Sequence, residues 1–260
     1  MAEPLPLCHL DGALLPLRAA RISPLDRGFL FGDGVYEVIA VRHGCALRLE
    51  HNLARLARSL HELRIRDPHT PQEWRRLVYA LVAAITPTVF GFCAPLPLPD
   101  PATLANGIRC ISAADTRWAR CDIKSVALLA NVLLRQQAID AGASETLLLR
   151  DGQLTEASAS AVHVVIGGEI RTPPRTTRLL PATTRGFIEE LAAANGIACR
   201  SAPVSESELR SAEEIWVSAA TRGAVPVTTL DGRPVGDGRP GPLWQRMHAL
   251  IEAAWTQARR

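Results

Sequence analysis

Residues 117–142 read RWARCDIKSVALLANVLLRQQAIDAG and contain Lys124, the single lysine of a chain that has 28 arginines. Arginine can replace lysine at most surface positions, but it cannot lose its proton and form an imine with a carbonyl group. A composition that has drifted this far toward arginine therefore indicates that the amine of Lys124 is required. The alternative is that one lysine has survived by chance and has no role.

The residues that follow Lys124 predict a helix. Its apolar residues recur at helical spacing: Val126, Leu129, Val132 and Leu133. Ser125 is a predicted N-cap and Gly142 a predicted stop. Lys124 would then lie just outside the helix N-terminus, where the helix dipole disfavours an ammonium. We therefore expect a neutral, nucleophilic amine.

The sequence on the N-terminal side predicts a small domain, residues 1–95. Its strands are expected in LCHLDGALLPL and in GVYEVIAVRHGCALRL, which would turn at Asp11-Gly12 and His43-Gly44. Its helices are expected in EHNLARLARSLHELRI and PQEWRRLVYALVAAI, with Arg55 off the apolar face of the first. The proline-rich GFCAPLPLPDPATL (91–104) is predicted to be an interdomain linker.

Residues 96–260 predict a larger domain of mixed composition. Strands are expected in GIRCISAAD, ETLLLRDGQLTEAS, AVHVVIGGEIRTPP and EEIWVSAATRGAVPVTTLDGRPV, with Asp151-Gly152 and Gly167-Gly168 as hairpin turns. One helix is expected to start with Thr183 or Thr184 as its N-cap and to stop at Gly196, and another lies in PLWQRMHALIEAAW. The predicted fold class is therefore α+β with two domains.

Composition narrows the range of functions. A net charge of +3, with both signs interspersed, argues against a nucleic-acid partner. No apolar stretch approaches the roughly 20 residues that cross a bilayer, and the first residues lack the pattern of a secretory signal. We therefore expect no membrane partner and a cytoplasmic location. The six cysteines and seven histidines show no metal-ligand spacing, so we expect reduced thiols and no metal.

Four segments resemble, in order, the motifs of fold type IV transaminases that use pyridoxal 5′-phosphate (PLP). They are DRGFLFGDGVYEV (26–38), RWARCDIKS (117–125), LTEASAS (154–160) and LLPATTR (179–185). Within that family the chain is most similar to the D-amino-acid aminotransferases. The resemblance implies a small N-terminal α/β domain, a larger C-terminal domain with a pseudo-barrel sheet, PLP as cofactor and a homodimer.

The resemblance also implies two central roles. Lys124 would form the Schiff base with PLP and then move a proton at the substrate Cα. Glu156 would pair with the pyridine nitrogen, and the charge-assisted hydrogen bond would hold the ring proton that makes PLP an electron sink. Without its motif, Glu156 would be interpreted as an exposed hairpin carboxylate.

Further roles are implied for the phosphate and the substrate. Arg55 would bind the phosphate, although an arginine on a helix is more often a solvated charge. The other implied cofactor-binding residues are Thr183 and Thr184 at a helix start, Ala220 and Thr221 in a second loop, Ser160 and Leu180. The implied substrate-binding residues are Tyr36, Val38 and Ser158. Ala161 stands where the family usually has asparagine, and Ala220 where it often has threonine.

One segment of the family pattern is absent. In D-amino-acid aminotransferases a strand, a turn and an Arg-x-His carboxylate trap follow the second helix, whereas here VYALVAAI (78–85) runs directly into TPTVFGFC (86–93). We therefore expect the N-terminal domain to lack one family strand near residues 85/86. Such a loss would expose a sheet edge and remove part of the substrate pocket.

The leading hypothesis is transamination between a D-amino acid such as D-alanine and a 2-oxo acid such as 2-oxoglutarate. Aminodeoxychorismate lyase is an alternative, because it shares the fold and the lysine but eliminates pyruvate. A branched-chain L-aminotransferase is another, although DRGFLFGDG departs from the pattern of that group. The third is a PLP-binding protein whose activity is impaired by the absent strand.

Overall fold

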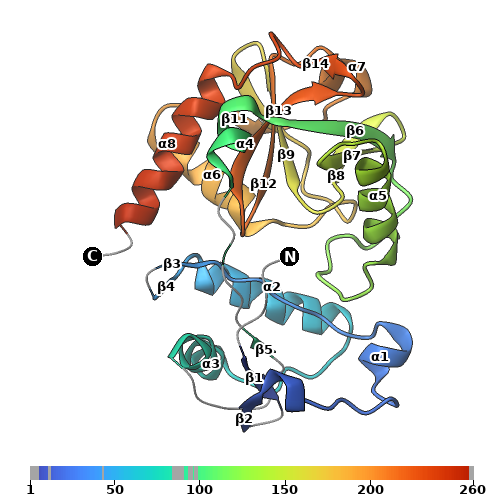
Figure 1. The fold of residues 1–260 in the computed structure, drawn as a ribbon, viewed down its shortest axis with the longest axis vertical. Coiled ribbons are helices and arrows are strands. Elements are labelled where there is room, and N and C mark those ends of the chain that lie inside the picture. Colours follow the sequence, from blue (N-terminus) through green and yellow to red (C-terminus); the bar gives the residue numbers. More distant parts are fainter. Residues whose placement is uncertain are drawn as a thin grey trace. The chain divides into compact units, whose positions relative to one another are not determined.

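The computed structural model describes residues 6–10, 13–42, 44–83, 91–92, 96 and 99–257. The chain forms two compact units (Figure 1). Unit 1 comprises Met1–Pro97 and Ile123–Ala127, and unit 2 comprises Leu98–Asp122 and Leu128–Arg260. The predicted boundary at residue 95 lies outside the described residues, and it would assign Ile123–Ala127 to the C-terminal domain.

Unit 1 combines short strands with two long helices. Its strands are β1 (Leu7–Leu10), β2 (Ala13–Pro16), β3 (Val41–Arg42), β4 (Cys45–Ala46) and β5 (Gly91–Phe92). Its helices are α1 (Arg27–Phe31), α2 (Leu49–Glu62) and α3 (Pro71–Ala83), with a 3₁₀ turn, η1 (Leu17–Ala19). β1 pairs antiparallel with β2 and β5. This pairing confirms the first predicted hairpin, whose Asp11-Gly12 turn lies outside the described residues.

The helices of unit 1 follow the prediction more closely than its strands. α2 buries Leu53, Leu56 and Leu60 on one face, as their spacing predicts. The two strands expected in residues 34–49 are reduced to β3 and β4, which have two residues each. Residues 34–36 pair instead with the segment around Lys124, through an isolated bridge between Val35 and Ser125. The absent family strand near 85/86 falls outside the described residues and stays a prediction.

The proline-rich segment 91–104, predicted to be an interdomain linker, contains the boundary between the two units, but both of its ends form secondary structure. β5 pairs with β1, and residues at the other end form the helix α4 (Pro101–Asn106). Proline is well suited to the first helical position, because the N–H that it lacks has no partner there. The Asp100 side chain caps the helix by accepting a hydrogen bond from the Ala102 N–H, 3.0 Å away.

Unit 2 is built on a nine-stranded, curled sheet (Figure 1). Its strands are β6 (Ile108–Ala114), β7 (Glu145–Arg150), β8 (Gln153–Ala157), β9 (Ala161–Ile166), β10 (Glu169–Thr172), β11 (Cys199–Ser201), β12 (Glu214–Ala219), β13 (Gly223–Leu230) and β14 (Arg233–Pro234). The strand order is β11-β10-β9-β12-β13-β6-β7-β8, and β14 pairs with β13. The β10–β11, β13–β6 and β6–β7 pairs are parallel and the others antiparallel. The predicted α+β class with a pseudo-barrel sheet is confirmed.

Four further helices complete unit 2. They are α5 (Leu129–Asp140), α6 (Thr183–Ala194), α7 (Glu206–Arg210) and α8 (Pro242–Gln257). In Figure 1, α5 lies beside β7, and α6 and α8 lie together at the other end of the sheet. α7 was not predicted, although Ser205 and Glu208 form the capping box that starts it.

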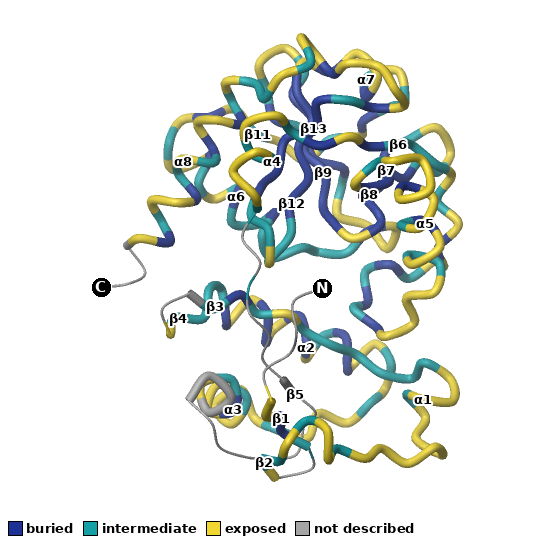
Figure 2. Tube along the Cα trace, in the orientation of Figure 1, coloured by how far each residue is buried: buried dark blue, intermediate teal, exposed yellow. Residues whose placement is uncertain are grey.

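The core of unit 2 lies along the central strands, which are the buried segments of Figure 2. Leu147, Val164 and Val217 are fully buried there. Burial of each such side chain contributes about 1.5–3 kcal/mol. Asp151 and Gly152 both have positive φ, 54° and 69°, in the two-residue turn between β7 and β8. This backbone geometry is what the Asp-Gly sequence predicts for a hairpin turn.

Two predicted helix starts were wrong. α5 begins at Leu129, whereas Ser125 is buried and bridged to Val35. Lys124 therefore lies more than one turn before the helix, where the dipole has little effect. α6 has Ala182 at its N-cap without a side-chain hydrogen bond, and Thr183 is its first helical residue.

Candidate active site

Lys124 is held in unit 1 by its backbone. Its carbonyl accepts a hydrogen bond from the Tyr36 N–H at 3.1 Å, and its N–H donates to Ser59 Oγ at 3.3 Å. The neighbouring Val126 N–H donates to the Gly34 carbonyl at 2.9 Å. The side chain then brings Nζ to 3.9 Å from the centroid of the Tyr36 ring. Two predicted site residues, Lys124 and Tyr36, are thus in direct contact.

Arg55 is buried, which the sequence did not indicate. Its Nε and Nη2 donate to the two carboxylate oxygens of Glu37 at 2.7 and 2.6 Å, and both side chains are less than a tenth exposed. Because Glu37 offsets the charge, the guanidinium is stable inside unit 1. The proposed phosphate role of Arg55 stays a prediction. Val38 is partly exposed, and its carbonyl accepts a hydrogen bond from Asn52 Nδ2 at 2.9 Å.

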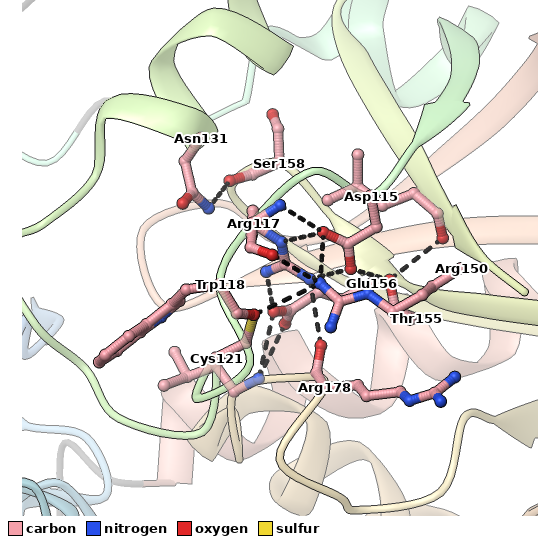
Figure 3. A network of polar contacts seen from close by, with 12 residues as sticks. Asp115, Arg117, Trp118, Cys121, Asn131, Arg150, Thr155, Glu156, Ser158 and Arg178 are labelled. Carbon is pink, nitrogen blue, oxygen red and sulfur yellow. Dashed lines mark hydrogen bonds and ion pairs between the residues drawn. The ribbon is translucent and has the colours of Figure 1, made fainter.

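Glu156, on β8, lies in a buried polar network of unit 2 (Figure 3). Its Oε1 accepts a hydrogen bond from Nη1 of Arg117, and the Leu180 N–H donates to Oε1 and Oε2 at 3.2 and 3.1 Å. Leu180, predicted to bind cofactor, is therefore brought together with Glu156. The interpretation of Glu156 as an exposed hairpin residue is excluded.

In this network, burial and the contacts with Arg117 shift the pKa of each carboxyl group in opposite directions. Burial raises the pKa of Glu156 to about 7, while the charge and hydrogen bond of Arg117 act to lower it. Burial alone would also raise the pKa of Asp115, but its hydrogen bonds with Arg117 outweigh that effect and lower the pKa. Arg117 lies in the RWARCDIKS motif (117–125). Its role was not predicted from the sequence, because its partner Glu156 is 39 residues away.

Ser158 and Ser160 lie near each other but face a carboxylate in this structure. Both hydroxyls donate to Glu145, which is fully buried at the start of β7. Arg135 Nη1 lies 3.3 Å from the same carboxylate, so its charge is offset. The predicted roles of the two serines beside cofactor and substrate stay predictions. Glu145 could not be found from local sequence, because its partners come from separate segments.

The predicted phosphate-binding residues of unit 2 lie at a helix start and a turn. Thr183 and Thr184 form the first turn of α6, where backbone N–H groups have no partner within the helix. Ala220 and Thr221 lie in the turn between β12 and β13. Both places offer the backbone donors that an anion requires, and neither role is tested by the structure.

Two kinds of feature are absent from the residues that the structure describes. No group of three or more His, Cys, Asp or Glu side chains that could hold a metal ion occurs among them. Within the same residues, no helix is both long and apolar enough to span a membrane. Five cysteines are described as free thiols, namely Cys8, Cys45, Cys110, Cys121 and Cys199.

Known proteins match both the sequence and the fold. The model of the family described as amino-transferase class IV matches residues 34–230. The chain belongs to the class IV aminotransferases. The protein is therefore an aminotransferase, and the resemblance seen in its four motifs is confirmed.

The class IV relatives cover nearly the whole chain. This aminotransferase is 34% identical to a D-alanine aminotransferase of Bacillus licheniformis, over 93% of this chain and 94% of the relative. Relatives of the same name from Listeria monocytogenes and Staphylococcus aureus are 33% and 31% identical. The first alignment runs over 268 positions, more than the 260 residues of this chain. It therefore includes positions at which this chain has no residue.

Solved structures also match this chain over more than nine-tenths of its length. A fold IV transaminase from Curtobacterium pusillum is 26% identical, with a TM-score of 0.82 over 94% of this chain and 92% of that one. The branched-chain amino acid aminotransferase of Escherichia coli has a TM-score of 0.87 over 97% and 94% of the two chains. At 21% identity, the latter shows the shared fold alone.

Proposed function

We propose that this aminotransferase transfers an amino group between a D-amino acid such as D-alanine and a 2-oxo acid such as 2-oxoglutarate, with PLP as its cofactor. The observation that carries the proposal is the match to D-alanine aminotransferases over more than nine-tenths of the chain. The single lysine of the chain, Lys124, lies in a motif of that family.

The residues present fit PLP. Lys124 supplies the one side-chain amine, and its Nζ lies over an aromatic face rather than in a buried ion pair with a described residue. Glu156 is a buried carboxylate whose Oε2 accepts one backbone N–H that it shares with Oε1, which leaves acceptor capacity for a ring N–H. The first turn of α6 has no side-chain cap, so its N–H groups are available to a phosphate.

When bound, PLP would supply an electron sink for the chemistry at the substrate Cα. Lys124 tethers the cofactor and, as an amine, moves the proton at that carbon. Glu156 accepts a hydrogen bond from the ring nitrogen and stabilises its positive charge. Thr183 and Thr184, with the Ala220-Thr221 turn, bind the phosphate through backbone N–H groups. Arg55 would contribute a positive charge to phosphate binding while it remains bound to Glu37.

A coupled assay tests the function. Protein loaded with PLP receives D-alanine and 2-oxoglutarate, and pyruvate is measured; L-alanine replaces D-alanine in a parallel arm, and Lys124→Ala is the control. We expect pyruvate from D-alanine, dependent on 2-oxoglutarate and lost in the variant. Pyruvate from L-alanine alone, or none from either enantiomer, would contradict the proposal. Pyruvate release from aminodeoxychorismate without an amino acceptor would identify a lyase.

We also propose that the protein is a homodimer that uses α5. Leu129, Val132 and Leu133 lie on one face of this helix and are 72%, 59% and 58% exposed. An apolar stripe of this kind on a surface helix is typical of a protein interface. Sedimentation velocity tests the proposal. Leu129→Glu/Leu133→Glu is expected to give monomers, and Tyr79→Glu, at an exposed site on α3, to leave the dimer intact.

A cytoplasmic location completes the proposal. The free thiols of the described cysteines are in keeping with a reducing compartment. Fractionation of the source cells with an antibody against this chain is the test, and recovery in an extracytoplasmic fraction would contradict it.

A further inference from the structure

Arg117 is fixed from three sides in unit 2. Its Nη1 donates to Glu156, and its Nε and Nη2 donate to Oδ1 and Oδ2 of Asp115, each at 2.9 Å. Nη2 also donates to the Arg178 carbonyl at 3.2 Å. The side chain is 4% exposed. A guanidinium bound at all three nitrogens has almost no rotational freedom, so its position relative to Glu156 is set.

Asp115 is held as firmly as Arg117. Thr155 Oγ1 donates to Oδ2 at 2.9 Å, the Arg117 N–H donates to Oδ1 at 3.1 Å, and Arg150 Nη2 lies 3.1 Å from Oδ1. Its carboxylate is fully buried. Asp115 thus anchors the arginine that contacts Glu156, and Figure 3 shows Arg117 reaching from one carboxylate toward the other.

When Glu156 is ionised, the charges of the network are balanced. Asp115 and Glu156 then carry two negative charges, and Arg117 and Arg150 carry two positive ones. The Cys121 thiol, whose pKa is raised by burial, adds no charge at neutral pH. Without Arg117, burial and the neighbouring Asp115 would favour a protonated Glu156, which could not stabilise a cationic ring.

The two oxygens of Glu156 are not equivalent. Oε1 accepts from Arg117 and from the Leu180 N–H, whereas Oε2 accepts from the Leu180 N–H alone among the described residues. A carboxylate oxygen has two acceptor sites, so Oε2 keeps one. The arginine therefore occupies one side of the carboxylate and leaves the other for a donor.

We propose that Arg117, anchored by Asp115, is a positioning residue that favours the ionised form of Glu156 and reserves its Oε2 for the ring nitrogen of the cofactor. This inference rests on the proposed PLP function. Arg117 acts through Glu156 and touches neither substrate nor cofactor itself.

The first test uses the protein without PLP. The side-chain carboxyl carbons of glutamate are labelled with ¹³C, and the Glu156 signal is identified by its loss in Glu156→Gln. We expect Arg117→Gln to move the Glu156 titration to higher pH. Arg171→Gln is the matched control, because Arg171 is a half-buried arginine paired with Glu169 and Glu208 that contacts neither Glu156 nor Arg117. An unmoved Glu156 titration in Arg117→Gln would overturn the proposal.

The second test is a double-mutant cycle on PLP affinity, measured by fluorescence quenching. Arg117→Gln is expected to weaken PLP binding about tenfold or more, as the loss of a charge-assisted hydrogen bond predicts. In the Glu156→Gln background the same change should have little further effect. Equal weakening in both backgrounds would mean that Arg117 acts independently of Glu156, which would overturn the proposal.

A second substitution guards against misfolding. Arg117→Lys keeps the positive charge, but an amine cannot reproduce the fork that joins both carboxylates. We expect a smaller shift of the Glu156 titration in the same direction, and no shift in either variant would refute the inference. Wild-type protein that binds no PLP would refute the proposed function instead, whereas PLP binding with an unmoved titration would refute the role of Arg117 alone.

Discussion

Each unit of the molecule buries a glutamate against an arginine. The two pairs differ in how many oxygens of the glutamate the arginine binds, and we call them the closed pair (Arg55–Glu37) and the open pair (Arg117–Glu156). In unit 1, Arg55 binds both oxygens of Glu37, so both ends of the carboxylate are occupied. In unit 2, Arg117 binds one oxygen of Glu156 and directs its other nitrogens to Asp115. In such a closed pair the carboxylate serves to stabilise the buried guanidinium. An open pair keeps a carboxylate that can accept another donor, which is what a cofactor site requires.

The largest expected effect concerns the closed pair. Glu37→Gln removes the carboxylate that binds the buried Arg55 guanidinium at two nitrogens and should lower the free energy of unfolding by about 3–5 kcal/mol. Urea unfolding measures it. The matched control is Glu50→Gln, which breaks the exposed pair with Arg75 at a cost below about 1 kcal/mol. Equal effects of the two substitutions would show that the closed pair does not stabilise unit 1.

The open pair should make the stability of the protein depend on pH. Because the pKa of Glu156 is raised to about 7, the folded protein without PLP binds an extra proton between pH 4.5, the ordinary pKa, and about pH 7. Stability must then fall as pH rises through this window, by a total on the order of 3 kcal/mol. Glu156→Gln should remove that decline, on top of a constant loss from the unpaired Arg117. Parallel stability curves for the two proteins would contradict the assignment of the raised pKa to Glu156.

Glu156→Gln should separate the binding of PLP from the rate of transamination. Glu156→Gln keeps the shape of the side chain but not its charge, so the protein should still bind PLP. Transamination should slow by roughly tenfold to a hundredfold, because a charge-assisted hydrogen bond contributes about 1.5–3 kcal/mol. Stopped-flow absorbance after addition of D-alanine measures the rate. Unchanged turnover would place the electrostatic support of the cofactor elsewhere.

The smallest expected effect on stability concerns Thr155, whose hydroxyl donates to the Asp115 carboxylate beside the open pair. Thr155→Val removes the hydroxyl that donates to Asp115 and should cost about 1 kcal/mol of stability. Thr155→Ser keeps the hydroxyl and is expected to stay close to the wild type in thermal unfolding. A larger loss in the serine variant would attribute the effect to packing of the methyl group.

Local signals in the sequence were sufficient for most of the fold. Periodicity located α2, α3 and α8, and the Asp-Gly and Gly-Gly turns located the hairpins of unit 2. Helix starts were less predictable. Ser125 has the side chain of an N-cap, but its backbone is committed to Val35, a partner that lies 90 residues earlier in the chain. Pairing over such distances leaves no trace in local sequence.

In the candidate site, too, contacts between residues far apart in the sequence could not be predicted. Lys124 and Glu156 could be found because each lies within a motif of known chemistry. The residues that control them could not, since Glu37 reaches Arg55 across 18 positions and Arg117 reaches Glu156 across 39. Their side chains also looked ordinary in a chain so rich in arginine. Burial, which gives these pairs their energy, is a property of the folded chain only.

The pairing of Ile123–Ala127 with residues 34–36 has a consequence for dissection of the molecule. Neither unit is a continuous stretch of chain, so no single cut releases both intact. A fragment that ends at Pro97 would lack the segment that hydrogen-bonds to Gly34 and Tyr36, and its remainder would carry the lysine without that support. Fragment complementation, rather than separate expression, is the route to studying either half.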